Sequence, residues 1–360
     1  MNRRRRVAML VENVKDSGGN RVLFLKAAEL AKSGGNHLTI YVTARRIARM
    51  KDVAGQARDI IASKIKYHFA DAVELLWGNV DFSRFDEVIT TGRRALDFID
   101  QLDDPRHLHL IQHIEAWGTL NSAMFREFAE SVRYPTGLDC LALIRRNAVP
   151  AELAYLDRLA HVTRFATVSN FLKSILESFA STKEVTLRPP PDVGAVPPIV
   201  TNRWASPSRD IDILYFMRGL PFKGDALIAD VINGLAKEGY RGVLIAGLRN
   251  RKMVDAIADK SRLRIINNIA PNHVVADLYS RARIVVHPSL SEGYGLIPRE
   301  ALRFGCHVIA SRTGELQDVT EAIDRLTIID RHLVELYVSE IRRVLQGVAP
   351  PQTTSPVRVG

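Results

Sequence analysis

One stretch near the C-terminal end, Ser291–Leu302, constrains this chain more than any other, and it reads SEGYGLIPREAL. The apolar residues 282–286 before it predict a buried parallel strand. A helix is predicted over residues 298–304, because Pro298 suits the first turn of a helix and Gly305 suits the position just past its end. A glycine-rich turn therefore joins the predicted strand to the predicted helix.

This arrangement of strand, glycine turn and helix N-terminus predicts an anion site, because unpaired backbone N–H groups converge there. Two carboxylates accompany it: Glu292 in the turn and Glu300 eight residues later in the helix. Carboxylates at such a place suit sugar hydroxyls rather than phosphate. The stretch therefore predicts a site for a ligand that is both phosphorylated and polyhydroxylated.

Length and composition favour a globular protein of two domains. The chain has 360 residues, of which 46% are hydrophobic and 25% charged. No apolar run approaches the roughly 20 residues that a membrane helix needs. The apolar stretch after Arg3–Arg6 is too short for a signal peptide. Cys140 and Cys306 stand far apart in the sequence, so neither a disulfide framework nor a metal site is expected, and a cytoplasmic location fits.

Positive charge gathers at the N-terminus of the chain. The net charge is +10, and residues 1–50 hold eleven Lys and Arg against three Asp and Glu. This excess predicts a basic face on the N-terminal domain, which would meet anionic lipid, nucleic acid or only water. The three alternatives stay open on the charge alone.

Apolar periodicity predicts a first series of alternating strands and helices over residues 1–192. The predicted strands are 7–11, 38–42, 87–90, 108–112 and 165–168, and the predicted helices are 21–32, 93–99 and 170–176. Gly18 and Gly19 form a loop at the carboxyl end of the first strand, where sheets of this kind bind ligands. His113, Glu115 and Trp117 follow a later strand in the same way, and are candidate site residues for that reason.

A proline-rich linker over residues 193–209 precedes a second series over residues 210–346, and residues 347–360 form a predicted flexible tail. The second series has predicted strands at 211–216, 242–246, 264–268, 282–286 and 307–310, and predicted helices at 227–237, 253–259, 273–281, 298–304 and 331–346. A loop and a helix are expected from residue 316 onward. Two such series predict an α/β protein of two facing, Rossmann-like doubly wound domains, with the ligand in a cleft between them.

The motif in Ser291–Leu302 resembles the E-x7-E signature of retaining glycosyltransferase family 4, whose members have the GT-B fold. Glu292 and Glu300 stand at its two acidic positions. The resemblance extends over both predicted domains and is densest over residues 211–320.

Three further segments carry the resemblance. Arg218 and Lys223 fall in a segment similar to the G-R-L-x-x-x-K-G of the family, although Met217 stands where the first glycine is usual. Residues 305–311 resemble the strand G-x-P-V-V-A-S, with histidine in place of proline. Ser17–Gly19 resembles the S-G-G loop near the N-terminus of family members. The combination, in this order along the chain, is more specific than any one part.

The resemblance implies a metal-independent transfer from a nucleoside-diphosphate sugar, with no cofactor and with retention of the anomeric configuration. Arg218 and Lys223 would neutralise the diphosphate as it leaves, and backbone N–H groups at the helix start would add to this. The leaving diphosphate would itself act as the base toward the incoming hydroxyl. The sugar moved would be a hexose or a deoxyhexose.

The resemblance also implies roles for single residues. Glu292 would hold hydroxyls of the transferred sugar, and Glu300 would accept hydrogen bonds from the ribose hydroxyls. His113 corresponds by location to a histidine near the transferred sugar. The implied donor-binding loops consist of Gly18, Gly19, Gly293, Tyr294, Gly295 and Leu296.

Paired carboxylates also serve glycosidases, as acid and base or as acid and nucleophile. The nearby Arg218 and Lys223 favour transfer from a diphosphate donor instead, because hydrolases do not need such a pair.

The expected acceptor is a lipid-linked or cell-surface glycan, because many relatives build such polymers at the inner membrane face, with peripheral contact to anionic lipid. Residues 112–117 resemble a segment of rhamnan and O-antigen transferases, which makes Glu115 and Trp117 candidate acceptor residues. Two alternatives remain: a glycosyltransferase that modifies a hydroxylated DNA base, and a non-catalytic nucleotide-sugar-binding protein.

Overall fold

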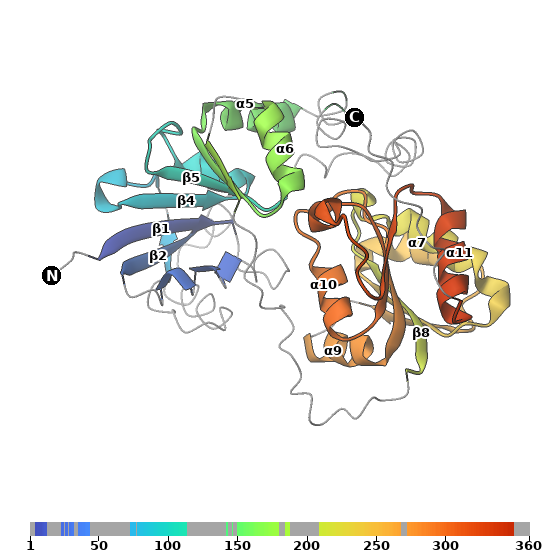
Figure 1. Cartoon of the computed structure of the whole chain (residues 1–360). Coiled ribbons are helices and arrows are strands. Elements are labelled where there is room, and N and C mark those ends of the chain that lie inside the picture. Colours follow the sequence, from blue (N-terminus) through green and yellow to red (C-terminus); the bar gives the residue numbers. More distant parts are fainter. Residues whose placement is uncertain are drawn as a thin grey trace. The chain divides into compact units, whose positions relative to one another are not determined.

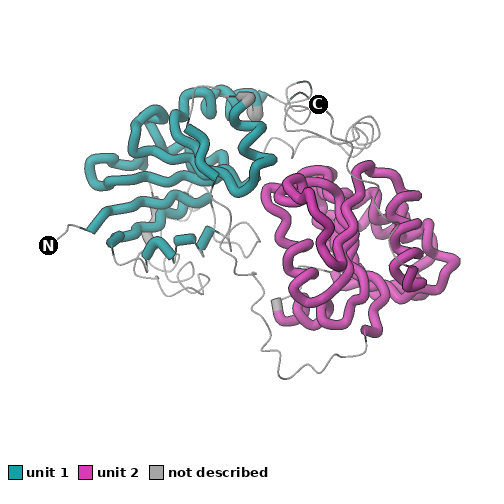
Figure 2. The backbone as a smooth tube through the Cα atoms, viewed as in Figure 1, with its two compact units in different colours: residues 1–119, 136–195 teal, residues 120–135, 196–360 magenta. Residues whose placement is uncertain are grey.

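The computed structural model describes residues 4–12, 23–24, 26–27, 29–31, 35–43, 73–76, 78–113, 142, 146, 150–179, 184–187, 209–267 and 272–348. These residues form two compact units, unit 1 up to residue 187 and unit 2 from residue 209 onward (Figure 2). Most of the predicted linker and tail lies outside the described residues, so the predicted domain boundaries stay predictions. Among the described residues, no helix combines the length and the apolar character needed to span a membrane.

Unit 1 is built on a parallel sheet, which in the described residues has the strand order β3-β2-β1-β4-β5-β6-β7 (Figure 1). The strands are β1 (Arg5–Val11), β2 (Asn36–Thr43), β3 (Val73–Leu76), β4 (Glu87–Thr91), β5 (His107–Ile111), β6 (Arg164–Thr167) and β7 (Glu184–Leu187). Its described residues include the helices α5 (Pro150–His161) and α6 (Asn170–Phe179), with 3-10 turns η2 (Phe82–Arg84) and η3 (Arg93–Phe98). The described residues between 23 and 31 are also helical.

Unit 2 repeats this plan with a parallel sheet in the order β10-β9-β8-β11-β12-β13. The strands are β8 (Ile211–Met217), β9 (Gly242–Ala246), β10 (Leu263–Asn267), β11 (Ala282–His287), β12 (His307–Ser311) and β13 (Leu326–Ile329). The α-helices are α7 (Asp225–Gly234), α8 (Arg251–Asp255), α9 (Asn272–Arg281), α10 (Leu296–Arg303) and α11 (Val334–Leu345). The 3-10 turns are η6 (Pro221–Lys223), η7 (Ala236–Glu238), η8 (Leu248–Asn250) and η9 (Gly314–Asp318).

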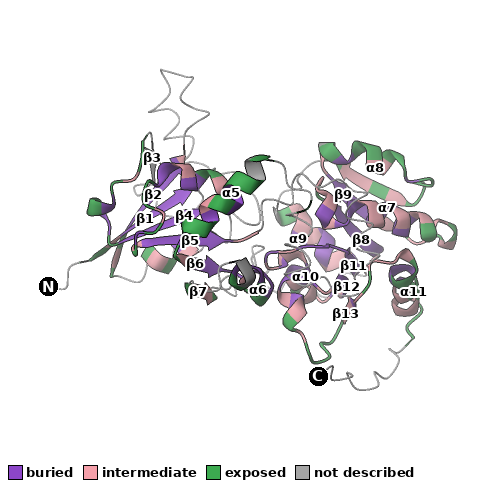
Figure 3. Cartoon of the chain, turned by 90° about the horizontal axis from the view of Figure 1, so that it is seen from above, coloured by how far each residue is buried: buried purple, intermediate pink, exposed green. Residues whose placement is uncertain are grey.

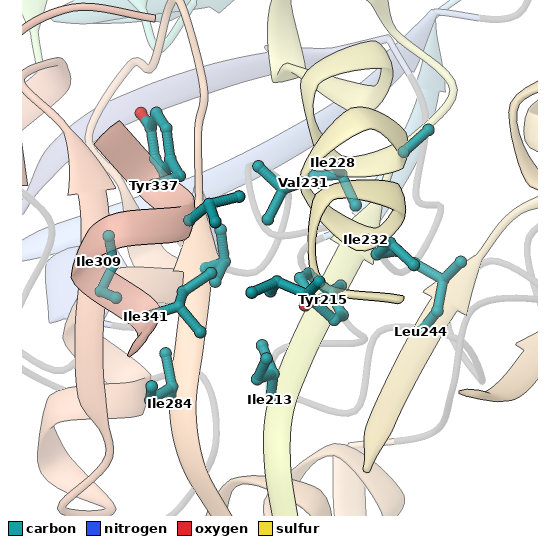
Figure 4. Close-up of a cluster of buried hydrophobic side chains, with 14 of the residues drawn as sticks. Ile213, Tyr215, Ile228, Val231, Ile232, Leu244, Ile284, Ile309, Tyr337 and Ile341 are labelled. Atoms are coloured by element: carbon teal, nitrogen blue, oxygen red, sulfur yellow. The ribbon is translucent and has the colours of Figure 1, made fainter. Parts of the chain in front are cut away.

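Helices cover both faces of the unit 2 sheet, which explains the continuous apolar runs of its strands. Alternate residues of β8 point to opposite faces. Ile213 and Tyr215 pack in one cluster with Ile228 of α7 and Tyr337 of α11 (Figure 4). On the other face, β8 packs in a cluster that includes residues of α9 and α10. Burial falls from the strands to the outer helices, as β8 and α8 illustrate (Figure 3).

The predicted fold class is confirmed: both units are doubly wound parallel α/β domains. Three strands were not predicted, β3, β7 and β13, and each is a four-residue strand at the edge of its sheet. The prediction of a loop and helix after residue 316 was wrong over β13. Edge strands are paired on one side only and less buried, so their apolar pattern is weaker, as the partly exposed β7 shows.

The strand order fixes where a ligand can bind in each unit. In unit 2 the order reverses at β8, which pairs with β9 on one side and with β11 on the other. The connections from β8 and β11 therefore leave in opposite directions and open a crevice at the carboxyl ends of these two strands. The motif Ser291–Leu302 follows β11 directly and so begins at this crevice.

Unit 1 buries a chain of polar groups inside its apolar core. The Thr90 hydroxyl lies 2.8 Å from His107 Nε2 and 2.8 Å from His109 Nδ1, and both histidines are fully buried. Burial, followed by the neighbouring His107, lowers the pKa of His109 from 6.5 to about 3. His109 is therefore neutral in the folded protein at neutral pH.

We predict that His109 makes unit 1 sensitive to acid. Between pH 6.5 and about 3 the unfolded chain protonates this side chain while the folded protein does not, so stability falls as the pH is lowered through that window. His109→Leu should lose less stability than the wild type between pH 7 and pH 4.5, measured by thermal unfolding. The exposed His161→Leu is the matched control, and equal pH slopes in wild type and His109→Leu would contradict the prediction.

Candidate active site

Four of the sequence-predicted site residues come together in unit 2. Arg218 directly follows β8, and Lys223 ends the 3-10 turn η6. Glu292 lies in the loop between β11 and α10, and Glu300 lies within α10. All four thus follow the carboxyl ends of β8 and β11, where the strand order reverses.

Glu292 is the centre of a buried charge cluster. Its Oε2 atom lies 2.8 Å from Lys223 Nζ, and its Oε1 atom lies 3.0 Å from His287 Nε2. The side chains of Lys223 and Glu292 are only 15% and 13% exposed, so water screens their attraction weakly. The last residue of β11 and the end of η6 are therefore tied together through one carboxylate.

This environment keeps Glu292 ionised. Burial on its own would raise the pKa of Glu292, but the charge of Lys223 and the hydrogen bond to His287 outweigh it and hold that pKa well below its usual range. A carboxyl group with so low a pKa carries no proton to donate near neutral pH. Glu292 is thus suited to accept hydrogen bonds and unsuited to act as a general acid.

Backbone hydrogen bonds fix the two loops around this cluster. The Phe222 carbonyl accepts hydrogen bonds from the Leu290 N–H (2.8 Å) and from the Ser289 hydroxyl (3.2 Å). Lys223 Nζ donates to the Ser291 carbonyl at 3.1 Å, and the Glu292 N–H donates to the Thr313 hydroxyl at 3.0 Å. The loops after β8, β11 and β12 therefore form one connected frame.

Two glycines permit this close approach. Gly224 has a left-handed backbone with φ of +74°, and a Cβ atom there would lie 2.0 Å from the Pro288 carbonyl oxygen. Gly314, with φ of +62°, would bring a Cβ atom to 2.5 Å from the Tyr294 carbonyl oxygen. Any side chain at either position would push the loops apart.

Helix α10 begins at Leu296, two residues before the predicted start at Pro298. Gly295 is its N-cap with φ of +104°, and no described side chain caps the helix. A Cβ atom at Gly295 would meet nothing within 4 Å, so the space beside the first turn is open. The backbone N–H groups at this helix start are available to an anion.

Glu300 lies one turn further along α10 and is 5% exposed. The Tyr279 hydroxyl donates a hydrogen bond to its Oε2 atom at 3.2 Å. Tyr279 belongs to α9 and stacks on Phe304, with ring centroids 5.6 Å apart. Burial, followed by the charge of Glu300, raises the pKa of this tyrosine well above its ordinary value, so it remains a donor. The two helices thereby hold one carboxylate oxygen in a fixed place.

Arg218 differs from the other three residues because its side chain is exposed. Of the remaining donor-side residues, Gly293, Tyr294, Gly295 and Leu296 all lie in the loop between β11 and the first residue of α10. Arg299 Cζ lies 5.1 Å from the centre of the Tyr294 ring and Arg299 Nε pairs with Glu315, which braces this loop from the side.

Of the site residues predicted in the N-terminal domain, only His113 is among the described residues. His113 lies two residues past β5 and is half-buried, in unit 1. Gly18, Gly19, Glu115 and Trp117 lie outside the described residues. Their assigned roles stay predictions. In the part of the chain that the structure describes, no three His, Cys, Asp or Glu side chains group as a metal site requires.

Sequence reasoning missed three residues that hold the site: His287, Tyr279 and Thr313. His287 directly follows the predicted strand 282–286 and stands five residues before Glu292. The position of His287 could have indicated a site residue, because the carboxyl end of a buried parallel strand lies at the crevice where ligands bind. Tyr279 and Thr313 each contact a glutamate of the motif that is 21 positions away in the sequence, and only the packing of α9 and η9 brings them near.

The C-terminal half of the chain matches a known family. Residues 200–352 match the sequence model of "Glycosyl transferases group 1". A curated relative, the D-inositol 3-phosphate glycosyltransferase of Corynebacterium glutamicum (strain R), is 30% identical over 95 residues. That match spans 26% of this chain and 22% of the relative, about a fifth of its length. The family match therefore lies in the unit that carries the cluster.

Solved structures match nearly the whole chain. Sucrose-phosphate synthase from Thermosynechococcus elongatus has a TM-score of 0.63 at 15% identity, covering 95% of this chain and 90% of that one. TarM has a TM-score of 0.65 at 9% identity, with coverage of 95% and 92%. Alr3699/HepE of Anabaena, in complex with UDP and glucose, has a TM-score of 0.55 at 13% identity, with coverage of 95% and 90%. These likenesses confirm the GT-B fold.

The charge cluster generates a prediction about stability. Lys223→Met should destabilise unit 2 by about 3 kcal/mol, because it leaves the Glu292 carboxylate buried without its cation. Adding Glu292→Gln should recover most of that loss, since the buried charge is then gone. Urea unfolding of the two single variants and the double variant measures this coupling. Effects that simply add in the double variant would show that the two side chains do not depend on each other.

Proposed function

We propose that the protein is a retaining, metal-independent glycosyltransferase that moves a hexose or deoxyhexose from a nucleoside-diphosphate sugar to a hydroxyl group. The observation that carries this is that Arg218, Lys223 and the N-terminus of α10 all follow the carboxyl ends of β8 and β11. The same place holds Glu292, whose side chain is 13% exposed, and the buried Glu300. The match to group 1 glycosyltransferases covers this same unit, and one structural neighbour was solved with UDP and glucose.

Lys223 has the capacity to hold both the frame and a phosphate. An ammonium group has three N–H donors, and the described contacts to Glu292 and to the Ser291 carbonyl use two of them. The third is left for a phosphate oxygen. Arg218, exposed after β8, and the N–H groups of α10 would add donors to the same diphosphate. Negative charge that develops on the leaving group would thus be stabilised by groups already in place.

Glu292 would orient the transferred sugar. A carboxylate has about four lone-pair sites, of which Lys223 and His287 take two, so two remain for sugar hydroxyls. Because the pKa of Glu292 is held low, a glycosidase mechanism with this residue as the acid is disfavoured. The leaving diphosphate would take the proton of the incoming hydroxyl, and Glu300 would bind the ribose.

For the acceptor we propose a lipid-linked or cell-surface glycan, with Glu115, Trp117 and His113 on the acceptor side. The basic N-terminal run offers less charge to an external anion than its sequence suggests. Arg5 pairs with Glu87 at 3.4 Å and Arg6 lies 3.9 Å from Asp86. No observation on the described residues favours a DNA acceptor. None of them tests contact with anionic lipid either, so that contact remains a prediction.

A donor panel tests the proposal. Among UDP-, GDP-, ADP- and dTDP-sugars, at least one should raise the melting temperature, because a ligand that binds only the folded state at 100 times its Kd adds about 2.7 kcal/mol. The same donor should be hydrolysed slowly or transferred to an added acceptor. A donor that raises the melting temperature without turnover would point to a binding protein. No shift and no turnover with any donor would refute the proposed function.

Two variants test the assigned roles. Glu300→Gln and Lys223→Ala should each reduce kcat/KM for the donor by about a hundredfold or more, because each removes a charged partner of the nucleotide sugar. Glu335→Gln and Lys237→Ala, at exposed positions of unit 2, are the matched controls and should keep wild-type rates. Near-normal turnover in Glu300→Gln or Lys223→Ala would remove that residue from the mechanism.

A further inference from the structure

Another buried carboxylate, Asp225, lies beside the site and has no part in the mechanism above. It is 4% exposed and occupies the first turn of α7. Its Oδ1 atom accepts the Arg218 N–H at 3.0 Å, and its Oδ2 atom accepts the Gly219 N–H at 2.7 Å. The loop that carries the exposed cation of the site is thus wrapped around this carboxylate.

Asn250 completes the arrangement. Its Nδ2 atom donates to Asp225 Oδ2 at 2.6 Å, and its Oδ1 atom accepts the Gly247 N–H at 3.2 Å. Asn250 is 1% exposed. Since Gly247 directly follows β9, the pair of side chains connects the loop after β8 to the loop after β9. These are the connections on one side of the crevice.

The loop after β8 is confined by shape as well as by hydrogen bonds. Gly219 has a left-handed backbone with φ of +74°, and a Cβ atom there would lie 2.8 Å from Arg249 Cβ. The backbone that leads into and out of Arg218 therefore has little room to change. Because the Arg218 side chain is exposed, its direction is set by the position of its own backbone.

A helix-capping role does not account for Asp225. Acids in the first turn of a helix commonly stabilise its N-terminus. This carboxylate, however, accepts hydrogen bonds from N–H groups of the preceding loop and from the Asn250 amide, while the N-cap of α7 is Gly224. Burying a carboxylate is costly unless hydrogen bonds offset the cost. Here the offsetting donors belong to the Arg218 loop.

We propose that Asp225, itself oriented by Asn250, is a positioning residue that fixes the Arg218 loop so that the guanidinium group meets the donor diphosphate. This inference rests on the proposed function of the site. Asp225 does not touch the donor and acts only through Arg218. Its removal should therefore weaken diphosphate binding only as long as Arg218 is present.

A double-mutant cycle tests this dependence. Asp225→Asn keeps the shape of the side chain but replaces one acceptor oxygen with an N–H donor, so at least one loop N–H loses its partner. In the full chain, calorimetric binding of the best nucleoside diphosphate among UDP, GDP, ADP and dTDP should weaken about tenfold in Asp225→Asn. In an Arg218→Ala background the same substitution should change the Kd less than twofold. Asp255→Asn, an exposed acid of the same unit, should bind as the wild type does.

The outcomes separate this inference from the proposed function. If the wild type binds none of the diphosphates, the proposed function fails and this inference fails with it. If the wild type binds and Asp225→Asn binds equally well, or its loss persists undiminished without Arg218, only the positioning role is refuted. Should Asp225→Asn not fold, Asn250→Ala decides. It removes one donor to the carboxylate, and should weaken binding in the wild-type background and not in Arg218→Ala.

Discussion

The site depends on burying an ionised carboxylate at the crevice of unit 2. Glu292 is only 13% exposed and stays charged because Lys223 and His287 each hold one of its oxygens. A charge in such a place is tolerated only where its partners stand at hydrogen-bond distance. The loops after β8 and β11 must therefore meet at a fixed separation. Gly224, where no Cβ atom fits beside Pro288, lets them do so.

Buried polar groups on both sides of this crevice hold the charged residues of the site in place through hydrogen bonds. Tyr279 holds one oxygen of Glu300 from α9, while Asp225 and Asn250 hold the loop of Arg218 from α7 and η8. Each supporting group is buried and each is fixed by packing against the sheet. The side chain of Arg218 differs from these groups because it is exposed, and we propose that it meets the donor diphosphate. A preorganised set of this kind stabilises developing charge without rearrangement when the charge appears.

Local pattern was enough to predict much of the fold, and it placed Glu292 in a glycine turn and Glu300 in the helix that follows, where the structure has them. The apolar run at 282–286 became β11, and the glycine turn before Pro298 became the start of α10, displaced by two residues because Gly295 takes the cap position. The residues that support the site could not be predicted from local sequence pattern. Tyr279, Thr313 and Asp225 gain their roles from strand order and helix packing, which place residues distant in sequence side by side. The low pKa of His109 was likewise beyond prediction, because it results from burial that only the fold produces.

The central claim is that the crevice of unit 2 binds the diphosphate of a nucleotide sugar, and a crystal structure of the full chain with a bound nucleoside diphosphate tests it most directly. The account predicts electron density for the diphosphate between Arg218, Lys223 and the first N–H groups of α10, with the ribose hydroxyls toward Glu300. Density for the diphosphate elsewhere, with these side chains unchanged and out of reach, would contradict it.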